Sequence, residues 1–177
     1  MRFRIHTSLN GLEPLQRLIN AAYRGNDGPG RWTTEQHLVA GDRIHRDALV
    51  SLIQHPQTEL IVGVEGMAGV EEGNVVSCIA IKQLEDAVEF GTFAVAPALQ
   101  GLGYGAQLLD FAEAHARRYR LPFQVCVVTQ NTQLIRFYER RGYVRTGALL
   151  PYPTDQNVGQ PKCHDISLTP LVKPLCW

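Results

Sequence analysis

Residues 93–106 read FAVAPALQGLGYGA, and this stretch decides the fold. Its apolar start is typical of a β-strand, and Gly101, Gly103 and Gly105 indicate a tight turn. Beyond the turn, apolar residues recur at helical spacing at Leu108, Leu109 and Ala112. The segment is therefore predicted to be a strand that passes through a glycine-rich turn into a helix.

Such a turn can bind an anion. Glycine adopts backbone dihedrals that other residues avoid, and it lets a ligand approach the main chain. The free N–H groups of the turn and of the first helical turn add to the helix dipole, so together they suit a pyrophosphate. A glycine-rich turn alone is about as often structural as functional, so the pattern around it has to decide.

Two common nucleotide motifs do not fit this stretch. A dinucleotide site needs Gly-x-Gly-x-x-Gly after the first strand, with an acidic residue further on. Here the third glycine, Gly105, has the wrong spacing, and the turn lies past the middle of the chain. A phosphate-binding loop of the Walker type needs Gly-Lys-Ser/Thr, which is missing from residues 93–106.

The residues before the turn predict helices followed by strands. A short strand is expected at Met1–Ile5, a helix at Glu13–Tyr23, a loop at Gly25–Gly30 and a second helix that opens at Trp32–Glu35, capped by a threonine. Three β-branched runs then indicate consecutive antiparallel strands. These runs are Leu60–Val64, Val75–Ile81 and Ala87–Val95.

The residues after the turn complete a mixed domain. A helix at Tyr104–Tyr119, a strand at Phe123–Thr129 and a helix at Asn131–Arg141 precede further strand material, with a linker-like segment at Pro151–Pro161. The order predicts an α/β (α+β) fold with one mixed, mostly antiparallel central sheet flanked by helices. We expect residues 1–177 to form one domain.

Two motifs in the right order resemble the Gcn5-related N-acetyltransferase (GNAT) superfamily. Gln100, Gly103 and Gly105 match its Gln/Arg-x-x-Gly-x-Gly/Ala pattern, and residues 94–97 (AVAP) match the preceding Ala-Val-x-Pro. Residues 131–143 (NTQLIRFYERRGY) are similar to its Asn-x-x-Ala-x-x-x-Tyr-x-x-x-Gly-Phe helix. Leu134 and Tyr143 depart mildly from that helix pattern. The resemblance covers roughly residues 60–147.

The resemblance implies a cofactor site for acetyl-CoA. The strands at Ala87–Val95 and Phe123–Thr129 would separate and admit the pantetheine arm, which would pair with the main chain near Phe93, Ala94 and Val95. The pyrophosphate would lie on the amides of Gln100, Gly101, Leu102, Gly103, Tyr104, Gly105 and Ala106. Asn131 would contact the pantetheine arm.

The resemblance also implies catalytic residues. Tyr138 is expected to protonate the thiolate leaving group; the alternative is an aromatic residue that only packs on its helix. Glu89 is expected to be the general base, because alternation places it on the face of Phe93 and Val95. A solvated carboxylate is the alternative interpretation of Glu89, and Glu35 is the rival base.

An acceptor wall is expected from the first helices and the C-terminal loop. Its candidates are Trp32, Glu35 and Tyr152, together with Tyr23, although aromatic residues more often simply pack. The amine acceptor itself is left open between small molecules and peptides.

Composition narrows the partners further. Lys and Arg number 17, as do Asp and Glu, and a formal charge of zero gives no reason to expect nucleic acid or a membrane surface as partner. The cysteines are Cys78, Cys126, Cys163 and Cys176; they have no zinc spacing, so we expect reduced thiols, no metal and a cytoplasmic location. A homodimer is left open.

The sequence therefore predicts an enzyme that transfers an acetyl group from acetyl-CoA to an amine. A non-catalytic acyl-CoA sensor of the same fold and a nucleotide-binding oxidoreductase are the alternatives.

Overall fold

The computed structural model of the chain describes residues 1–25, 32–66 and 73–175. Within these ranges a central sheet holds eight strands in the order β1-β3-β4-β5-β6-β10-β7, with β8 paired to β10. They are β1 (Arg2–His6), β3 (Thr58–Glu65), β4 (Asn74–Gln83), β5 (Val88–Val95), β6 (Phe123–Val128), β7 (Val144–Arg145), β8 (Leu150–Pro151) and β10 (Ser167–Lys173). All of these pairings are antiparallel except that of β5 with β6. The predicted mixed, mostly antiparallel sheet is confirmed.

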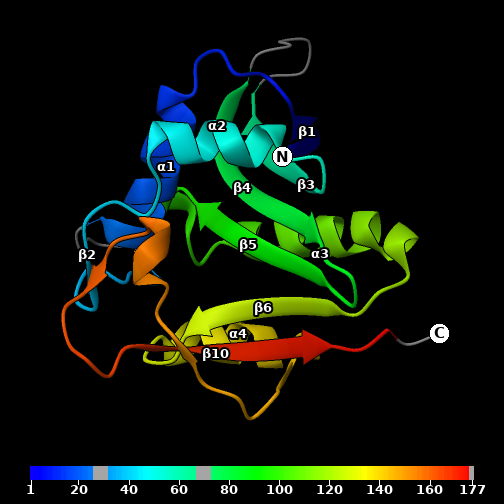
Figure 1. Cartoon of the computed structure of the whole chain (residues 1–177). Coiled ribbons are helices and arrows are strands. Elements are labelled where there is room, and N and C mark those ends of the chain that lie inside the picture. The colour runs from blue at the N-terminus through cyan, green and yellow to red at the C-terminus, as the bar shows by residue number, and fades with distance from the viewer. Residues whose placement is uncertain (26–31, 67–72, 176–177) are drawn as a thin grey trace.

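Helices cover both faces of the sheet (Figure 1). The helices α1 (Glu13–Arg24) and α2 (Arg46–Gln54) pack on one face, and α3 (Tyr104–Ala116) and α4 (Thr132–Glu139) pack on the other. Strand β4 shows how one segment serves both layers. Its Cys78 and Ala80 lie in the core under α1 and α2, and its Ile79 and Ile81 lie in the core under α3 and α4.

The helix ends follow local chemistry. Helix α1 has a proline in its first turn, ends at Arg24 and is followed by Gly25 as its C-cap. Helix α3 begins after Gly103, which is left-handed with φ 87°. Helix α4 begins at Asn131, whose side chain accepts a hydrogen bond of 3.3 Å from the Leu134 N–H.

An irregularity in β5 changes which residues face which side. Thr92 has φ 47°, and the register with β4 shifts between Cys78 and Ala80. One extra residue in a strand turns every later side chain to the opposite face. Phe90 and Phe93, three positions apart, consequently both pack with the α3 and α4 core.

Strands β5 and β6 diverge soon after they meet. Their parallel pairing joins Val88–Phe90 to Phe123–Val125, and no register continues from there towards Val95. The remainder of β5 therefore has one edge free of β6, next to the glycine-rich turn. This gap positions the candidate site.

Two expectations for the outer segments were wrong. Residues 32–35 form no helix; they are followed by a turn and by β2 (Val39–Ala40), and the next helix is α2. The linker-like segment Pro151–Pro161 contains β9 (Gln160–Pro161), which pairs with β2 in a second small sheet. Of the predicted loop Gly25–Gly30, residues 26–30 lie outside the described residues.

Candidate functional site

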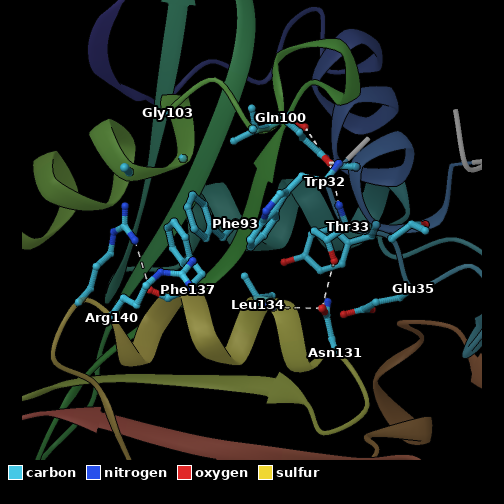
Figure 2. Close-up of a pocket in the computed structure, with 18 residues that line it drawn as sticks. Trp32, Thr33, Glu35, Phe93, Gln100, Gly103, Asn131, Leu134, Phe137 and Arg140 are labelled. Atoms are coloured by element: carbon cyan, nitrogen blue, oxygen red, sulfur yellow. Dashed lines mark hydrogen bonds between the residues drawn. The ribbon is translucent and has the colours of Figure 1, made fainter. Parts of the chain in front are cut away.

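A cavity of about 300 Å³ opens where β5 and β6 separate. It lies between the end of β5, the start of α3, helix α4 and the segment 32–35 (Figure 2). Its lining comprises Ala22, Tyr23, Trp32, Thr33, Thr34, Glu35, Phe93, Val95, Gln100, Gly101, Gly103, Gly105, Ala106, Asn131, Leu134, Phe137, Arg140 and Arg141. The volume is at the lower end of what small-molecule sites provide.

The glycine-rich turn presents free N–H groups to this cavity. Gly101 and Gly103 have φ of 77° and 87°, where side chains are strained. The first backbone bond of α3 runs from Gln107 N–H to Gly103 O, over 3.1 Å, so the preceding N–H groups have no partner within the helix. These groups and the dipole of a 13-residue helix favour an anion at this end.

The turn that follows helix α4 supplies two cations to the cavity wall. Arg140 and Arg141 both line the cavity. The Arg141 guanidinium lies 3.9 Å from the ring centre of Phe137 and donates to the Phe137 carbonyl, so it is held against α4. Cations on the wall of a cavity that also contains the turn amides add to its attraction for phosphate.

Residues 32–35, here called the bridging segment, cross the cavity between the two motifs. Gln100 Oε1 accepts hydrogen bonds from the N–H groups of Trp32 and Thr33, at 3.1 and 3.2 Å. From the other side, Asn131 Oδ1 accepts from the Thr33 hydroxyl at 3.1 Å. Figure 2 shows both side chains reaching the bridging segment. The two motif residues thus hold the opposite wall of the cavity.

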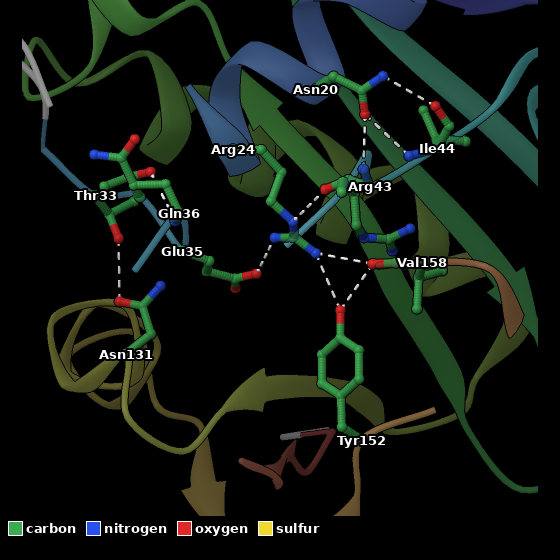
Figure 3. A network of polar contacts seen from close by, with 12 residues as sticks. Asn20, Arg24, Thr33, Glu35, Gln36, Arg43, Ile44, Asn131, Tyr152 and Val158 are labelled. Carbon is green, nitrogen blue, oxygen red and sulfur yellow. Dashed lines mark hydrogen bonds and ion pairs between the residues drawn. The ribbon is translucent and has the colours of Figure 1, made fainter. Parts of the chain in front are cut away.

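A buried ion pair fixes the far end of the bridging segment (Figure 3). Arg24 Nη1 lies 2.6 Å from Glu35 Oε2, and both side chains are only 8% exposed. Arg24 Nη2 donates to the Tyr152 hydroxyl at 3.0 Å and to the Val158 carbonyl at 2.9 Å. Glu35 lines the cavity, whereas Tyr152 is not among its lining residues and acts on it through Arg24.

Two tyrosines, Tyr23 and Tyr138, lie close to each other, and Tyr23 also lies close to the backbone amide of Phe93. Burial raises the pKa of Tyr23, and the nearby Phe93 N–H partly offsets this effect. Burial also raises the pKa of Tyr138 well above its usual value, and the neighbouring Tyr23 adds to this. Both phenols therefore stay protonated through neutral pH.

Tyr138 is buried and does not face the cavity directly. It is 3% exposed, packs edge-on against Phe137 and Tyr143, and is not among the lining residues. Its ring centre is 6.3 Å from that of Phe93, which does line the cavity. Tyr138 therefore lies directly behind the wall, close to Tyr23.

Glu89 does not share a face with Phe93 and Val95, so that part of the sequence reasoning was wrong. Glu89 lies before the irregularity at Thr92 and directly opposite Lys82 in register, on the face of α1 and α2. Simple alternation failed because it could not anticipate the extra residue. Glu89 remains half-buried, and its charge contributes to the raised pKa of Cys126 on β6.

Most residues predicted to bind the cofactor do line the cavity. Ala94, Leu102 and Tyr104 do not: Ala94 packs under α1, Leu102 is exposed, and the Tyr104 hydroxyl bonds to Glu65. The sequence reasoning missed Phe137, Arg140 and Arg141 as lining residues. Their signal was available, because Leu134 and Phe137 lie on one face of α4 and Arg141 continues the same spacing in the turn that follows.

The described residues contain neither a metal-binding cluster nor a membrane-spanning helix. In residues 1–25, 32–66 and 73–175, no group of three or more His, Cys, Asp or Glu side chains could hold a metal ion. In the same ranges no helix is long and apolar enough to cross a membrane.

The family comparison agrees with this geometry. The profile described as "Acetyltransferase (GNAT) family" matches residues 19–143, well over half of the chain. The chain belongs to the acetyltransferase (GNAT) family. Members of this family are typically acyl-CoA-dependent N-acetyltransferases. No curated protein matches the sequence.

Solved GNAT structures share the fold at low sequence identity. A GNAT family acetyltransferase from Elizabethkingia anophelis with acetyl-CoA bound has a TM-score of 0.64 at 15% identity, covering 98% of this chain and 97% of its own. A variant of spermidine N-acetyltransferase from Vibrio cholerae has 0.65 at 16%, covering 98% and 96%. The ribosomal-protein-S18-alanine N-acetyltransferase from Escherichia coli has 0.65 at 16%, covering 99% and 96%. The names of the last two show that one GNAT fold serves very different acceptors.

Proposed function

We propose that this protein transfers an acetyl group from acetyl-CoA to a primary amine of a small molecule or peptide by direct attack. One observation carries the proposal. A single cavity combines the glycine-rich turn and two arginines with the phenol of Tyr23 and the carboxylate of Glu35, and the free edge of β5 lies along it. A long molecule with phosphates at one end and a reactive thioester at the other suits such a cavity.

The proposed cofactor extends through the cavity from the glycine-rich turn to the edge of β5. Its pyrophosphate lies on the amides of residues 100–106, beside Arg140 and Arg141. Its pantetheine arm extends along the free edge of β5 at residues 93–95. Asn131 contributes its NH₂ group, because its oxygen already accepts from Thr33 and from the Leu134 N–H.

The reaction balances without a further reagent. The neutral amine attacks the thioester carbonyl carbon, and a C–N bond forms. The tetrahedral oxyanion is stabilised by the Phe93 N–H, which directly follows the irregular residue Thr92 and lies near the Tyr23 hydroxyl. The C–S bond then breaks, the nitrogen loses its proton, and the thiolate gains one to leave as free CoA.

Tyr138 is the proposed donor of the proton to the thiolate. Its raised pKa keeps the phenol protonated at neutral pH, as a general acid must be, and it lies behind Phe93 next to Tyr23. Glu89 is the proposed base, acting through water from the α1 face. Glu35 is less suited to that role because Arg24 already holds its carboxylate.

An acceptor screen tests the proposal. The protein is incubated with acetyl-CoA and a panel of amines, amino acids and peptides, and thiol release is measured. We expect CoA to raise the melting temperature, NAD to leave it unchanged, and at least one amine to release thiol. Binding of CoA with no thiol release from any acceptor would leave the non-catalytic sensor as the better function.

A further inference from the structure

The guanidinium of Arg43 lies over the ring of Tyr23, which lines the cavity, although Arg43 itself is not a lining residue. Within residues 1–25, 32–66 and 73–175 it forms no ion pair with a carboxylate. Arg43 is half-buried, and its backbone N–H is held by Asn20 Oδ1 at 2.9 Å. In the parts of the chain that the structure describes, no salt bridge or side-chain hydrogen bond joins its guanidinium to another residue. Figure 3 shows this side chain beside the Arg24 network but not linked into it.

The guanidinium of the neighbouring Arg24, in contrast, is hydrogen-bonded on several sides. Arg24 binds Glu35, the Tyr152 hydroxyl, the Val158 carbonyl and the Gly41 carbonyl. The pair of Arg24 and Glu35 is therefore internally neutral, and Arg43 adds one positive charge beside it. The other carboxylate of this sheet face, Glu89, stands directly opposite Lys82 in register.

Arg43 lies close to the proposed reaction centre. Its Cζ is 5.1 Å from the ring centre of Tyr23, and its charge acts on Tyr152 as well. Tyr23 lines the cavity, and its hydroxyl lies near the Phe93 N–H. An amine that attacks a thioester there would be about the length of one phenol side chain from the guanidinium.

The same sheet face has open space at Gly91. A methyl group placed on Gly91 would meet no atom within 4 Å, and Gly91 precedes the irregularity in β5, on the side of α1 and α2. A partly buried cation without a counter-ion is costly, and a guanidinium is shaped to hold a carboxylate by two parallel hydrogen bonds.

We infer that Arg43 binds a carboxylate of the acceptor, and that the acceptor is an amine with a carboxylate close by, as in an amino acid. This inference rests on the proposed function, because it assigns the substrate class of the same site. A polyamine, with positive charge alone, would be repelled by the unneutralised arginine.

Matched acceptors that differ only in the carboxylate test the inference. L-Leucine is compared with 3-methylbutylamine, and L-phenylalanine with 2-phenylethylamine, by thiol release from acetyl-CoA. We expect kcat/KM at least tenfold higher for the amino acid of each pair. In Arg43→Gln the preference should disappear, mainly through KM, while the rate with the decarboxylated amine stays the same.

Arg46→Gln is the matched control, since Arg46 is half-exposed and pairs only with Glu13 on the surface. It should leave the preference intact, and Arg43→Lys should restore part of it. Equal kcat/KM within the pairs, or a preference that survives Arg43→Gln, overturns the inference while the acetyltransferase function stands.

A binding measurement keeps the inference testable without turnover. N-acetyl-L-leucine and N-acetyl-3-methylbutylamine are titrated calorimetrically into the protein saturated with CoA. Tighter binding of the acid, lost in Arg43→Gln, supports the inference, and equal or absent binding overturns it. Failure of the proposed function has a different signature: no thiol release from any amine.

Discussion

The phenol of Tyr143 donates a 2.9 Å hydrogen bond to Glu113, a buried carboxylate of α3 that also pairs with Lys173 at 2.6 Å. This contact explains why the chain has tyrosine where the family pattern has phenylalanine. The hydroxyl ties the segment that follows α4 to α3, and Lys173 ties β10 to the same carboxylate.

Tyr143→Phe should lower the free energy of unfolding by about 1.5–3 kcal/mol, because the buried carboxylate loses a hydrogen bond. Chemical denaturation measures the loss. Tyr119→Phe, which removes a hydroxyl from a partly exposed cluster, is the control and should cost under about 0.5 kcal/mol. Equal losses in the two variants would contradict a special role for Glu113.

Tyr138→Phe should reduce kcat by about 10²–10⁴-fold, the usual contribution of general acid catalysis, while the Kd for CoA stays the same. Tyr138 is buried, and no hydrogen bond joins its hydroxyl to another described residue, so the fold should tolerate removal of the hydroxyl. Stopped-flow kinetics and calorimetry give the two quantities. A variant with full kcat would reduce Tyr138 to a packing residue.

Glu89→Gln should lower kcat/KM more than Glu35→Gln does at neutral pH, if Glu89 is the base. Glu35→Gln should instead destabilise the fold, because it leaves Arg24 buried without its counter-ion. Rate and melting temperature together separate the two carboxylates. The reverse order of rates would transfer the role of base to Glu35.

Cys126 reports on the charge of Glu89. Burial and the charge of Glu89 raise the pKa of Cys126 to about 11, and burial raises that of Cys78 to about 12. Thiolate is the reactive form, so both should alkylate far more slowly at pH 8 than the exposed Cys163. Peptide mapping after iodoacetamide treatment should show this order, with Cys126 faster in Glu89→Gln. An unchanged Cys126 rate would argue that the Glu89 side chain does not act on the Cys126 thiol.

Gly103→Ala should weaken CoA binding. Gly103 has φ 87°, and a side chain there costs about 1–2 kcal/mol and turns the amides away from the phosphates. Gly147→Ala is the control: Gly147 has φ 86° and lies outside the cavity lining. We expect both to lose similar stability but only Gly103→Ala to raise the Kd. Matching Kd values would remove the turn from the cofactor site.

The sequence predicted the parts of the fold that depend on local patterns. The strand, turn and helix around Gly103 follow from glycine chemistry and periodicity, and so does helix α4 from Asn131. The prediction of a helix at Trp32 was wrong because Gln100, far along the chain, accepts hydrogen bonds from the N–H groups of Trp32 and Thr33. The prediction of the sheet face of Glu89 was wrong because one left-handed residue, Thr92, reverses the alternation of side chains in β5. The Arg24 network and the position of Arg43 over Tyr23 have no short-range signal in the sequence.

Through the bridging segment, the proposed binding sites for the two substrates cannot change independently during evolution. Its backbone is gripped by Gln100 and its Thr33 by Asn131, and these are the same residues by which the family is recognised. If residues 32–35 select the amine, as proposed, mutations in them should therefore also change the affinity for acetyl-CoA. Laboratory selection for a new acceptor should repeatedly yield compensating changes near positions 100 and 131.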